Sequence, residues 1–239
     1  MKVLVADYDD AALQKIGGEI STIKTDVSKL EDWAKLKSKV DQDFNGQVNL
    51  LALNAGVGGK SSWEDLSIFH KIIDTNVFGV LNGISTFLPS IKEKAATTPS
   101  AIVITGSKQG ITNPPGNPAY NLSKAAVKSA AEHLSYDLRG TGIGVHLLVP
   151  GWTHTGMTGA NSRDKPDGAW WPDQVVDYLE KKMNEGQFWA ICPDNDVTEA
   201  LDRKRMQWTA SDAIEGRPPL SRWRDEWKEK HQDWVEKQK

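Results

Sequence analysis

The sequence has almost no cysteine, which bears on where the protein works. Cys192 is the single cysteine among 239 residues, so the chain cannot form an internal disulfide. The first apolar run, residues 2–6, ends at Asp7 and is too short for the core of a signal peptide. No apolar run approaches the length that crosses a membrane. We therefore expect a protein of a reducing compartment, most simply the cytoplasm, with no membrane partner.

The sequence also lacks an excess of positive charge. Its formal net charge is -3, and Lys and Arg are interspersed with Asp and Glu. Without a basic field the chain has little to attract phosphate backbones, which argues against a nucleic-acid partner. A hydrophobic fraction of 38% and a charged fraction of 26% are consistent with one large domain over residues 1–239.

Short apolar runs alternate with amphipathic segments up to about residue 151. We expect strands at residues 2–6, 21–27, 47–56, 101–107 and 144–151. We expect helices at residues 9–17, 29–44, 69–93 and 120–139. Residues 47–56 are almost wholly apolar and are typical of a strand buried on both faces. This alternation predicts an α/β fold, a doubly wound, Rossmann-like parallel sheet with right-handed crossovers.

The regular alternation fades after Trp152. Residues 152–217 mix glycine, proline and asparagine with tryptophan, and we expect them to form a lid or insert region beside the substrate. Helices are expected there at residues 172–185 and 198–211, with a last strand at residues 188–194. Residues 218–239 form a helical tail, with Trp223, Trp227 and Trp234 near one face. This tail is expected to pack either on the body or on a second subunit.

Polar groups follow several of the expected strands. Asn54-Ala55-Gly56 ends one strand, Ser107 ends the next, and Tyr120 and Lys124 lie at the start of the helix that follows. The carboxyl ends of parallel strands converge on one crevice, where ligands bind. Tyr120 and Lys124 are spaced i and i+4 and share one helix face. The pattern predicts a site that contains both hydroxyl groups and the ammonium group.

At these residues the chain resembles the short-chain dehydrogenase/reductase family. The matches are Asp26-Val27, Asn54-Ala55-Gly56, Thr75-Asn76, Gly106-Ser107, the segment YNLSK at 120–124 and the segment PGWTHT at 150–155. A lone Tyr-x-x-x-Lys is weak evidence, whereas all of these in the family's order are strong evidence. The resemblance implies hydride transfer between a nicotinamide cofactor and an alcohol or ketone, by a homodimer or homotetramer.

The resemblance also implies catalytic roles. Tyr120 would be the general acid-base, and Lys124, one turn away, would favour its phenolate and reach the nicotinamide ribose. Ser107 would donate a hydrogen bond to the reacting oxygen. Asn76 would hold a water that links Lys124 to solvent, through a helix distortion or through its side chain.

The family's cofactor contacts can be carried over in the same way. Asp7 would bind the adenosine ribose and repel a 2'-phosphate, which favours NAD over NADP. Asp26 would touch the adenine, Asn54 the wall beside it, and Thr155 the nicotinamide carboxamide. The full implied set is Asp7, Asp26, Val27, Asn54, Ala55, Gly56, Tyr120, Lys124, Pro150, Gly151, Thr153 and Thr155.

The tryptophans after position 152 have two interpretations. Trp is the largest apolar side chain, so these residues more often fill a core than recognise a substrate. A lid lined by Trp152, Trp170 or Trp171 would nevertheless suit a bulky, apolar or aromatic substrate. His154 has no acidic or cysteine partner at ligand spacing, so we interpret it as a structural or substrate-contacting residue and expect no metal site.

The sequence departs from the family pattern at the pyrophosphate. Family members carry a first strand and a T-G-x-x-x-G-x-G turn, and the sequence contains neither; Gly17-Gly18 follows a helix and lacks the spacing. In the family this strand lies between the strands expected at 2–6 and 47–56. Those two could pair directly, a partner chain could fill the gap, or the sequence could be part of a longer protein.

Three functions remain open at this point. The first is a nicotinamide-dependent dehydrogenase or reductase, supported by Ser107, Tyr120 and Lys124. The second is a cofactor-independent lyase or isomerase that uses Tyr120 and Lys124 for proton transfer, suggested by the missing phosphate site. The third is a non-catalytic family member that does not bind NAD or NADP.

Overall fold

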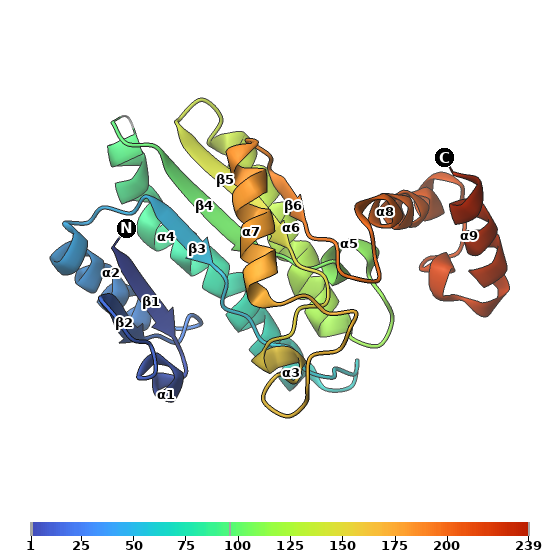
Figure 1. Cartoon of the computed structure of the whole chain (residues 1–239), viewed down its shortest axis with the longest axis horizontal. Coiled ribbons are helices and arrows are strands. Elements are labelled where there is room, and N and C mark those ends of the chain that lie inside the picture. The colour runs from blue at the N-terminus through green and yellow to red at the C-terminus, as the bar shows by residue number, and fades with distance from the viewer. Residues whose placement is uncertain (1, 96, 239) are drawn as a thin grey trace.

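A computed structural model describes residues 2–95 and 97–238 (Figure 1). The strands are β1 (Val3–Asp7), β2 (Ile20–Lys24), β3 (Leu50–Leu53), β4 (Ser100–Thr105), β5 (Ile143–Val149) and β6 (Trp189–Ile191). The α-helices are α1 (Asp10–Leu13), α2 (Leu30–Phe44), α3 (Leu66–Ile73), α4 (Gly79–Ala95), α5 (Gln109–Thr112), α6 (Pro118–Asp137), α7 (Pro172–Asn184), α8 (Glu199–Ile214) and α9 (Asp225–Lys237). The π-turn η1 (Asp74–Phe78) and the 3-10 turns η2 (Gly156–Thr158) and η3 (Ser221–Trp223) complete the described elements. The alternation of strands and helices, the last strand at β6 and the helices after residue 171 are confirmed.

All paired strands run parallel, and they form two sheets. β1 pairs with β2, with Val3 opposite Ile20. The other sheet has the order β3-β4-β5-β6. Each of these strands is joined to the next through a helical connection, which is the doubly wound arrangement that the sequence predicted.

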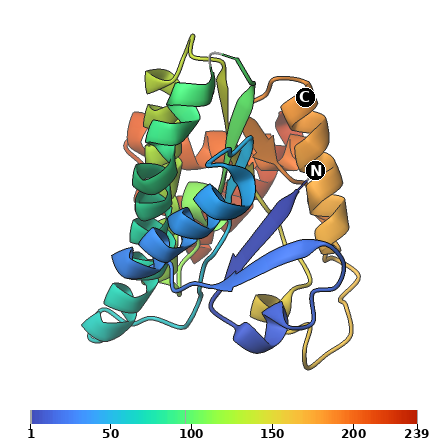
Figure 2. The same cartoon turned by 90° about the vertical axis from the view of Figure 1, so that its left-hand side faces the viewer.

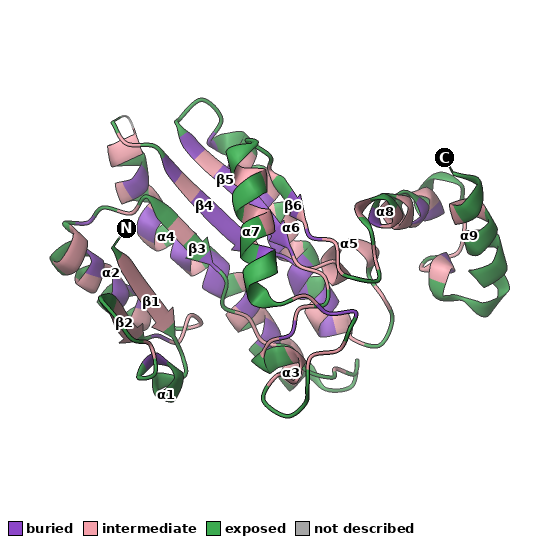
Figure 3. Cartoon of the chain, viewed as in Figure 1, coloured by how far each residue is buried: buried purple, intermediate pink, exposed green. Residues whose placement is uncertain are grey.

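Helices cover the two faces of the larger sheet unequally. On one face α2, α4 and α6 pack against the strands around a core that includes Trp33, Phe87 and Val127. On the other face α7 packs through Val175 against β4, β5 and β6, where it meets Cys192. Figure 2 shows the helices of the first group on one side of the strands and α7 on the other. Figure 3 shows that buried residues concentrate in β4, β5 and the first group of helices.

The expectation that the strand within 47–56 is buried on both faces is wrong. Leu53 faces the core, but Leu50 is 44% exposed and Ala52 is also exposed. The reason is that α7 covers residues of β4, β5 and β6 and does not reach β3. In the described residues β1 and β3 belong to different sheets, so these two strands do not pair directly either.

The helix expected at residues 69–93 is present but contains a local distortion. α3 continues through η1 into α4, so a π-turn is inserted at Asp74–Phe78. Such turns carry one extra residue and are frequent at functional sites. Asn76 lies within this turn and is almost fully buried.

The C-terminal helices form an arm that extends away from the sheets (Figure 1). Its interior is built around Trp208 of α8, whose ring lies 6.4 Å from that of Trp227, 5.1 Å from His231 and 5.5 Å from Trp234. Trp223 lies outside this cluster and is 37% exposed. The expected tail helix therefore packs on α8 of its own chain, through two of the three tryptophans on its predicted face.

Candidate active site

Tyr120 and Lys124 lie together at the start of α6. Pro118 occupies the first turn of this helix, where its missing N–H costs nothing. The Lys124 Nζ atom lies 5.8 Å from the centre of the Tyr120 ring. Burial raises the pKa of Tyr120, and a hydrogen bond with the Ser107 hydroxyl acts in the opposite direction. The structure thus brings Ser107, Tyr120 and Lys124 to one place, as their spacing predicted.

The Ser107 hydroxyl is held by the turn that follows β4. Its Oγ accepts a hydrogen bond from the backbone N–H of Gln109 at 3.2 Å. The hydroxyl proton remains available to donate, because only the oxygen lone pair is used in that bond. Ser107 can therefore act as a donor toward the Tyr120 hydroxyl or toward a substrate oxygen.

Lys124 is a buried cation with a backbone partner. Its side chain is almost fully enclosed, and Nζ donates a hydrogen bond to the Thr105 carbonyl at 2.8 Å. Burial lowers the pKa of Lys124 to about 8, because the charged form loses water. Lys124 can therefore change its charge state near neutral pH while remaining beside the phenol.

Asn76 connects the turn after β3 to α6. Its Oδ1 accepts from the Val57 N–H at 2.7 Å, and its Nδ2 donates to the Val57 carbonyl and to Ser123 Oγ, both at 3.0 Å. Ser123 Oγ in turn donates to the Tyr120 carbonyl at 2.7 Å. The Asn76 side chain is thus committed to protein contacts, and its backbone lies in the π-turn.

Gly56 packs closely against Asn76 and Lys124. A Cβ atom at this position would lie 3.3 Å from Asn76 Oδ1 and 3.6 Å from Lys124 Nζ. Asn54, two residues earlier, accepts a hydrogen bond from Thr105 Oγ1 at 2.9 Å through its side-chain oxygen. Ala55 lies between them and is exposed. The segment from Asn54 to Gly56 therefore forms a wall beside Lys124, with Ala55 open to solvent.

The loop after β5 carries the residues expected near the nicotinamide. Thr153 Oγ1 donates to the Gly151 carbonyl at 3.3 Å, and the Thr155 N–H donates to Thr158 Oγ1 at 2.9 Å. Pro150 is half-buried at the start of this loop. These contacts fix the conformation of the loop itself, which leaves β5 beside the end of β4, the strand that precedes Ser107.

Asp7 is the last residue of β1, and Asp26 and Val27 follow β2. Asp7 is exposed, and its Oδ1 accepts from the Asp9 N–H at 2.8 Å. Asp26 Oδ1 accepts from both the N–H and the hydroxyl of Ser28. The Val27 carbonyl accepts from Trp33 Nε1 at 2.8 Å, so this residue also fastens α2.

The start of α1 does not offer a phosphate site. The short helix α1, which follows β1, begins with Asp9 and Asp10, and the Asp9 side chain already accepts from the Ala12 N–H. A negatively charged first turn repels phosphate instead of binding it. Gly17 and Gly18 follow this helix, as the sequence indicated, and do not open one.

His154 and two tryptophans lie next to the loop after β5. His154 is buried, and its backbone N–H donates to the Trp170 carbonyl at 2.8 Å. Its ring meets that of Trp171 edge-on, with 5.3 Å between the ring centres. Trp152 is 41% exposed and Trp171 48% exposed. Exposed aromatic surface beside a catalytic crevice can contact an apolar molecule.

Several contacts in the site have no sequence signal. The Thr105 carbonyl that binds Lys124 is a backbone group, which any residue type would supply. Ser123 lies inside the YNLSK segment, but its bond to Asn76 joins two distant parts of the chain.

In the described part of the chain no group of three or more His, Cys, Asp or Glu side chains is placed to hold a metal ion. None of the helices within residues 2–95 and 97–238 is long and apolar enough to cross a membrane.

Comparison with known proteins identifies relatives of this arrangement. A protein of Myxococcus xanthus named "Uncharacterized oxidoreductase" is 32% identical over 158 residues, which are 64% of this chain and 60% of that protein. Human 17-beta-hydroxysteroid dehydrogenase type 1 is 29% identical over 162 residues, 67% of this chain and 45% of that enzyme. The chain thus spans about half the length of these two curated relatives.

Solved structures agree with the sequence matches. A short chain dehydrogenase/reductase from Burkholderia phymatum, solved in complex with NAD, has a TM-score of 0.79 and 28% identity, over 92% of this chain and 87% of that one. A 3-ketoacyl-(acyl-carrier-protein) reductase from Brucella melitensis, solved with NADH, has a TM-score of 0.70 at 23% identity, over 81% and 86% of the two chains, and shows the fold alone. The family model described as short chain dehydrogenase matches residues 1–166. The chain therefore belongs to the short chain dehydrogenase family.

Proposed function

We propose that this protein is an oxidoreductase that transfers a hydride between a nicotinamide cofactor and an alcohol or ketone. The observation that carries the proposal is the convergence of Ser107, Tyr120 and buried Lys124 at the carboxyl edge of the sheet. Family membership supports the same reaction type. The nicotinamide, when bound, supplies or accepts the hydride.

Tyr120 is the proton donor or acceptor in this proposal. An ordinary phenol has a pKa near 10, and burial raises that of Tyr120 further. Two neighbours favour the phenolate: the Lys124 cation 5.8 Å from the ring centre and the Ser107 hydroxyl. Ser107 also orients the reacting oxygen, and Lys124 with the wall at Asn54, Ala55 and Gly56 holds the nicotinamide ribose.

The remaining cofactor contacts follow from the family pattern. Thr155 and Thr153, with Pro150 and Gly151 before them, would hold the carboxamide end. Asp7 would accept from the adenosine ribose, which favours NAD over NADP, because a 2'-phosphate would meet its carboxylate. The relatives supply both precedents, since solved structures include one with NAD and one with NADP.

The exposed aromatic groups on the loop after β5 support a bulky, apolar or aromatic substrate. Trp152 and Trp171 expose much of their surface next to the loop that carries Thr155. Residues 152–217 would then act as the substrate lid and residues 218–239 as a separate helical tail of one domain. The same aromatic rings could instead pack against one another or against a neighbouring copy, which a substrate-bound structure would distinguish.

We further propose a homodimer or homotetramer that works in the cytoplasm. Exposed apolar side chains on η1, α4 and α6 support the assembly: Phe78 is 49% exposed, Leu81 40%, Leu122 47% and Tyr136 64%. Apolar surface of this kind is typical of faces that become buried between subunits.

A cofactor-independent proton-transfer enzyme, a lyase or isomerase, is the second candidate. The observation in its favour is the acidic start of α1 together with the split between the two sheets, which leaves the described residues without a backbone cradle for pyrophosphate. If two or three charge-assisted hydrogen bonds are missing, dinucleotide binding weakens by roughly 3–9 kcal/mol. A non-catalytic member that keeps the frame and does not bind NAD or NADP is the third candidate.

Cofactor binding and turnover distinguish these candidates. NADH and NADPH are titrated while cofactor fluorescence is recorded, and turnover is then measured with a panel of apolar and aromatic ketones and alcohols. We expect NADH to bind more tightly, and Tyr120→Phe to lower turnover by about 10²–10⁴ without changing NADH affinity. Activity that needs no added nicotinamide would instead support the lyase or isomerase. Equal activity of the wild type and Tyr120→Phe would contradict both enzyme proposals.

A further inference from the structure

Three largely buried charged side chains, Lys108, Asp194 and Asp202, form an ion-pair cluster beside Ser107, called the node below. Lys108, the next residue, has its side chain turned inward and only 17% exposed. Its Nζ lies 2.6 Å from Asp202 Oδ2 and 3.5 Å from Asp194 Oδ1. Both carboxylates are themselves about nine-tenths buried. One cation therefore meets two carboxylates at the point where the chain leaves β4.

The node joins the loops that follow three neighbouring strands. Lys108 lies after β4 and its N–H donates to the Pro150 carbonyl of the loop after β5 at 3.4 Å. Asp194 lies after β6, and its Oδ2 accepts from the Trp152 N–H in that same loop at 2.9 Å. A Cβ atom on Gly151 would lie 3.1 Å from Lys108 Nζ, so the loop backbone passes close to the ammonium. The node thus fixes Ser107 relative to the loop that carries Thr153 and Thr155.

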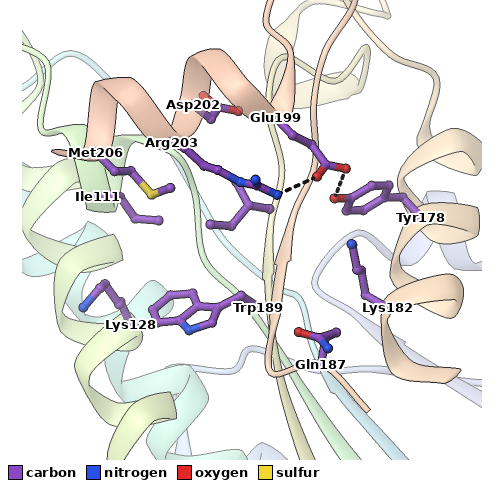
Figure 4. Close-up of a pocket in the computed structure, with 11 residues that line it drawn as sticks. Ile111, Lys128, Tyr178, Lys182, Gln187, Trp189, Glu199, Asp202, Arg203 and Met206 are labelled. Carbon is purple, nitrogen blue, oxygen red and sulfur yellow. Dashed lines mark hydrogen bonds and ion pairs between the residues drawn. The ribbon is translucent and has the colours of Figure 1, made fainter. Parts of the chain in front are cut away.

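Asp202 extends the node to the base of the C-terminal arm. Figure 4 shows Asp202 and Glu199 on the first part of α8, at the rim of a pocket. This pocket has a volume of about 360 Å³. Glu199 accepts a hydrogen bond from Tyr178 of α7 at 2.8 Å and lies 3.5 Å from Arg203. The first turn of α8 is therefore attached to α7 through Glu199 and to the turn after Ser107 through Asp202. None of Ser107, Tyr120 and Lys124 lines this pocket.

The energetics of such a node favour a positioning role. Burial raises the pKa of Asp202, while Lys108 acts to lower it. Taking three charged groups out of water costs free energy that their attraction offsets only in part, so a buried pair adds little net stability over apolar side chains. Removing one partner, however, leaves an uncompensated charge, which makes the geometry strongly specified.

We propose that Lys108 is a positioning residue that acts through Ser107: its ammonium, held by Asp194 and Asp202, fixes the Ser107 hydroxyl relative to Tyr120 and to the loop at 150–155. This inference rests on the proposed oxidoreductase function. It implies that Asp202, at the start of the C-terminal arm, helps to hold Ser107 in position. Loss of the node lets the turn after β4 shift, and the Ser107 hydrogen bond to Tyr120 weakens.

The test compares Lys108→Met, Lys108→Arg and Asp202→Asn with the wild type. Lys108→Met is expected to lower kcat by about tenfold to hundredfold, because small misplacements of a catalytic group cost that much. Lys108→Arg, which keeps the charge, is expected to restore part of the loss. The Ser107 bond favours the Tyr120 phenolate, so its weakening raises the Tyr120 pKa and moves the pH dependence of kcat toward alkaline pH.

Asp212→Asn is the matched control. Asp212 is a buried carboxylate of the same arm that pairs with Arg217 at 3.2 Å and accepts from the Ser221 N–H at 3.0 Å. It is expected to destabilise the arm without moving the pH dependence. The double variant Lys108→Met/Asp202→Asn removes a cation and a carboxylate together, and it is used if the single variant does not fold.

A second readout needs no substrate. The ionisation of Tyr120 is followed by the absorbance of its phenolate, as the difference between each protein and the same protein carrying Tyr120→Phe. An alkaline shift in the Lys108→Met background, absent in Asp212→Asn, supports the proposal. Unchanged ionisation and unchanged kcat, or equal changes in Lys108→Met and Asp212→Asn, would overturn it. Failure of the wild type to turn over any ketone or alcohol would refute the proposed function while leaving this titration to decide the node.

Discussion

Lys124 combines burial with a charge, and this combination should be visible in stability. Its pKa of about 8 lies below the ordinary value of 10.5, so the folded state disfavours the charged form. Below pH 8 the side chain is charged in both the folded and the unfolded protein, so the free-energy cost of burying the charge is fully present. As pH rises from 8 to 10.5 the folded protein loses the proton first, so its stability increases over that range.

The corresponding prediction concerns Lys124→Met. At pH 7 this variant should have a free energy of unfolding higher by about 1–3 kcal/mol, because a buried charge is replaced by an apolar side chain. The difference should shrink as pH rises through 8 to 10.5, while turnover is lost throughout. Urea unfolding at several pH values measures it. Lys128→Met, at a half-buried position one turn further along α6, controls for the loss of a lysine. A variant that is destabilised at pH 7 would show that the bond from Lys124 to the Thr105 carbonyl outweighs the cost of burying the charge.

Gly56 supports a second residue-scale prediction. In Gly56→Ala the new methyl group would lie 3.6 Å from Lys124 Nζ and 3.3 Å from Asn76 Oδ1, so the Asn76 side chain must shift by a few tenths of an ångström. Turnover should fall at least about tenfold, with the KM for the cofactor raised because the ribose wall is narrowed. Steady-state kinetics with the cofactor varied measures both effects.

Gly17→Ala is the control for this change. A Cβ atom at Gly17 meets nothing within 4 Å. This substitution should leave kinetics unchanged and alter stability by less than about 1 kcal/mol. Equal kinetics of the two alanine variants would show that the space at Gly56 is not used.

At the residue scale the sequence predicted side chains better than it predicted their partners. Ser107, Tyr120 and Lys124 could be placed together because strand ends converge and i, i+4 residues share a helix face. The Thr105 carbonyl and the pairing of Lys108 with Asp202 could not, since the first is a backbone atom and the second joins distant segments. Nothing in the sequence around Lys108 shows whether its charged side chain is buried in an ion-pair cluster or exposed to solvent.

The exposed edge of β3 is the element whose behaviour differs most from its sequence. Its apolar residues predicted burial on both faces, yet Leu50 is 44% exposed because α7 ends its coverage at β4. Coverage by a helix from another part of the chain cannot be read from the strand's own residues. The family resemblance offered a helix distortion at Asn76, where the π-turn lies, but the short α5 was not predicted, because it depends on tertiary contacts.

An unpaired apolar strand edge predicts self-association. β1 and β3 belong to different sheets in the described residues, and β3 offers both backbone groups and Leu50 at its edge. Leu50→Lys should reduce concentration-dependent aggregation without lowering the melting temperature, since a charge on an exposed edge discourages pairing. Light scattering over a concentration series measures it.

Leu30→Lys provides the comparison for this element. Leu30 is 67% exposed but begins the helix α2, where no strand edge is offered. If both lysine variants reduce aggregation equally, net charge and not the strand edge is responsible.

On the scale of the whole molecule the chain has a sheet-centred body and a helical arm. The core of the body includes Phe87, Val127 and Ile104, whereas the arm is organised around Trp208. The sequence predicted the tail helix from its spaced tryptophans, but it left open whether the tail packs on its own chain. The decisive contacts are aromatic pairs between α8 and α9, which spacing along one helix cannot reveal.

This division predicts that the arm unfolds separately from the body. Trp208 is 3% exposed and contacts Trp227, His231 and Trp234, while Arg217 stacks on its ring at 3.8 Å. Trp208→Ala should cost the arm about 3–5 kcal/mol, enough to open α8 and α9 while the sheet stays folded. Hydrogen exchange followed by mass spectrometry should then lose protection over 199–237 and keep it in β4 and β5. Phe87→Ala, which creates a cavity in the core of the body, should instead reduce protection from hydrogen exchange in the sheet. If Trp208→Ala lowers protection equally in both parts, arm and body unfold as one cooperative unit.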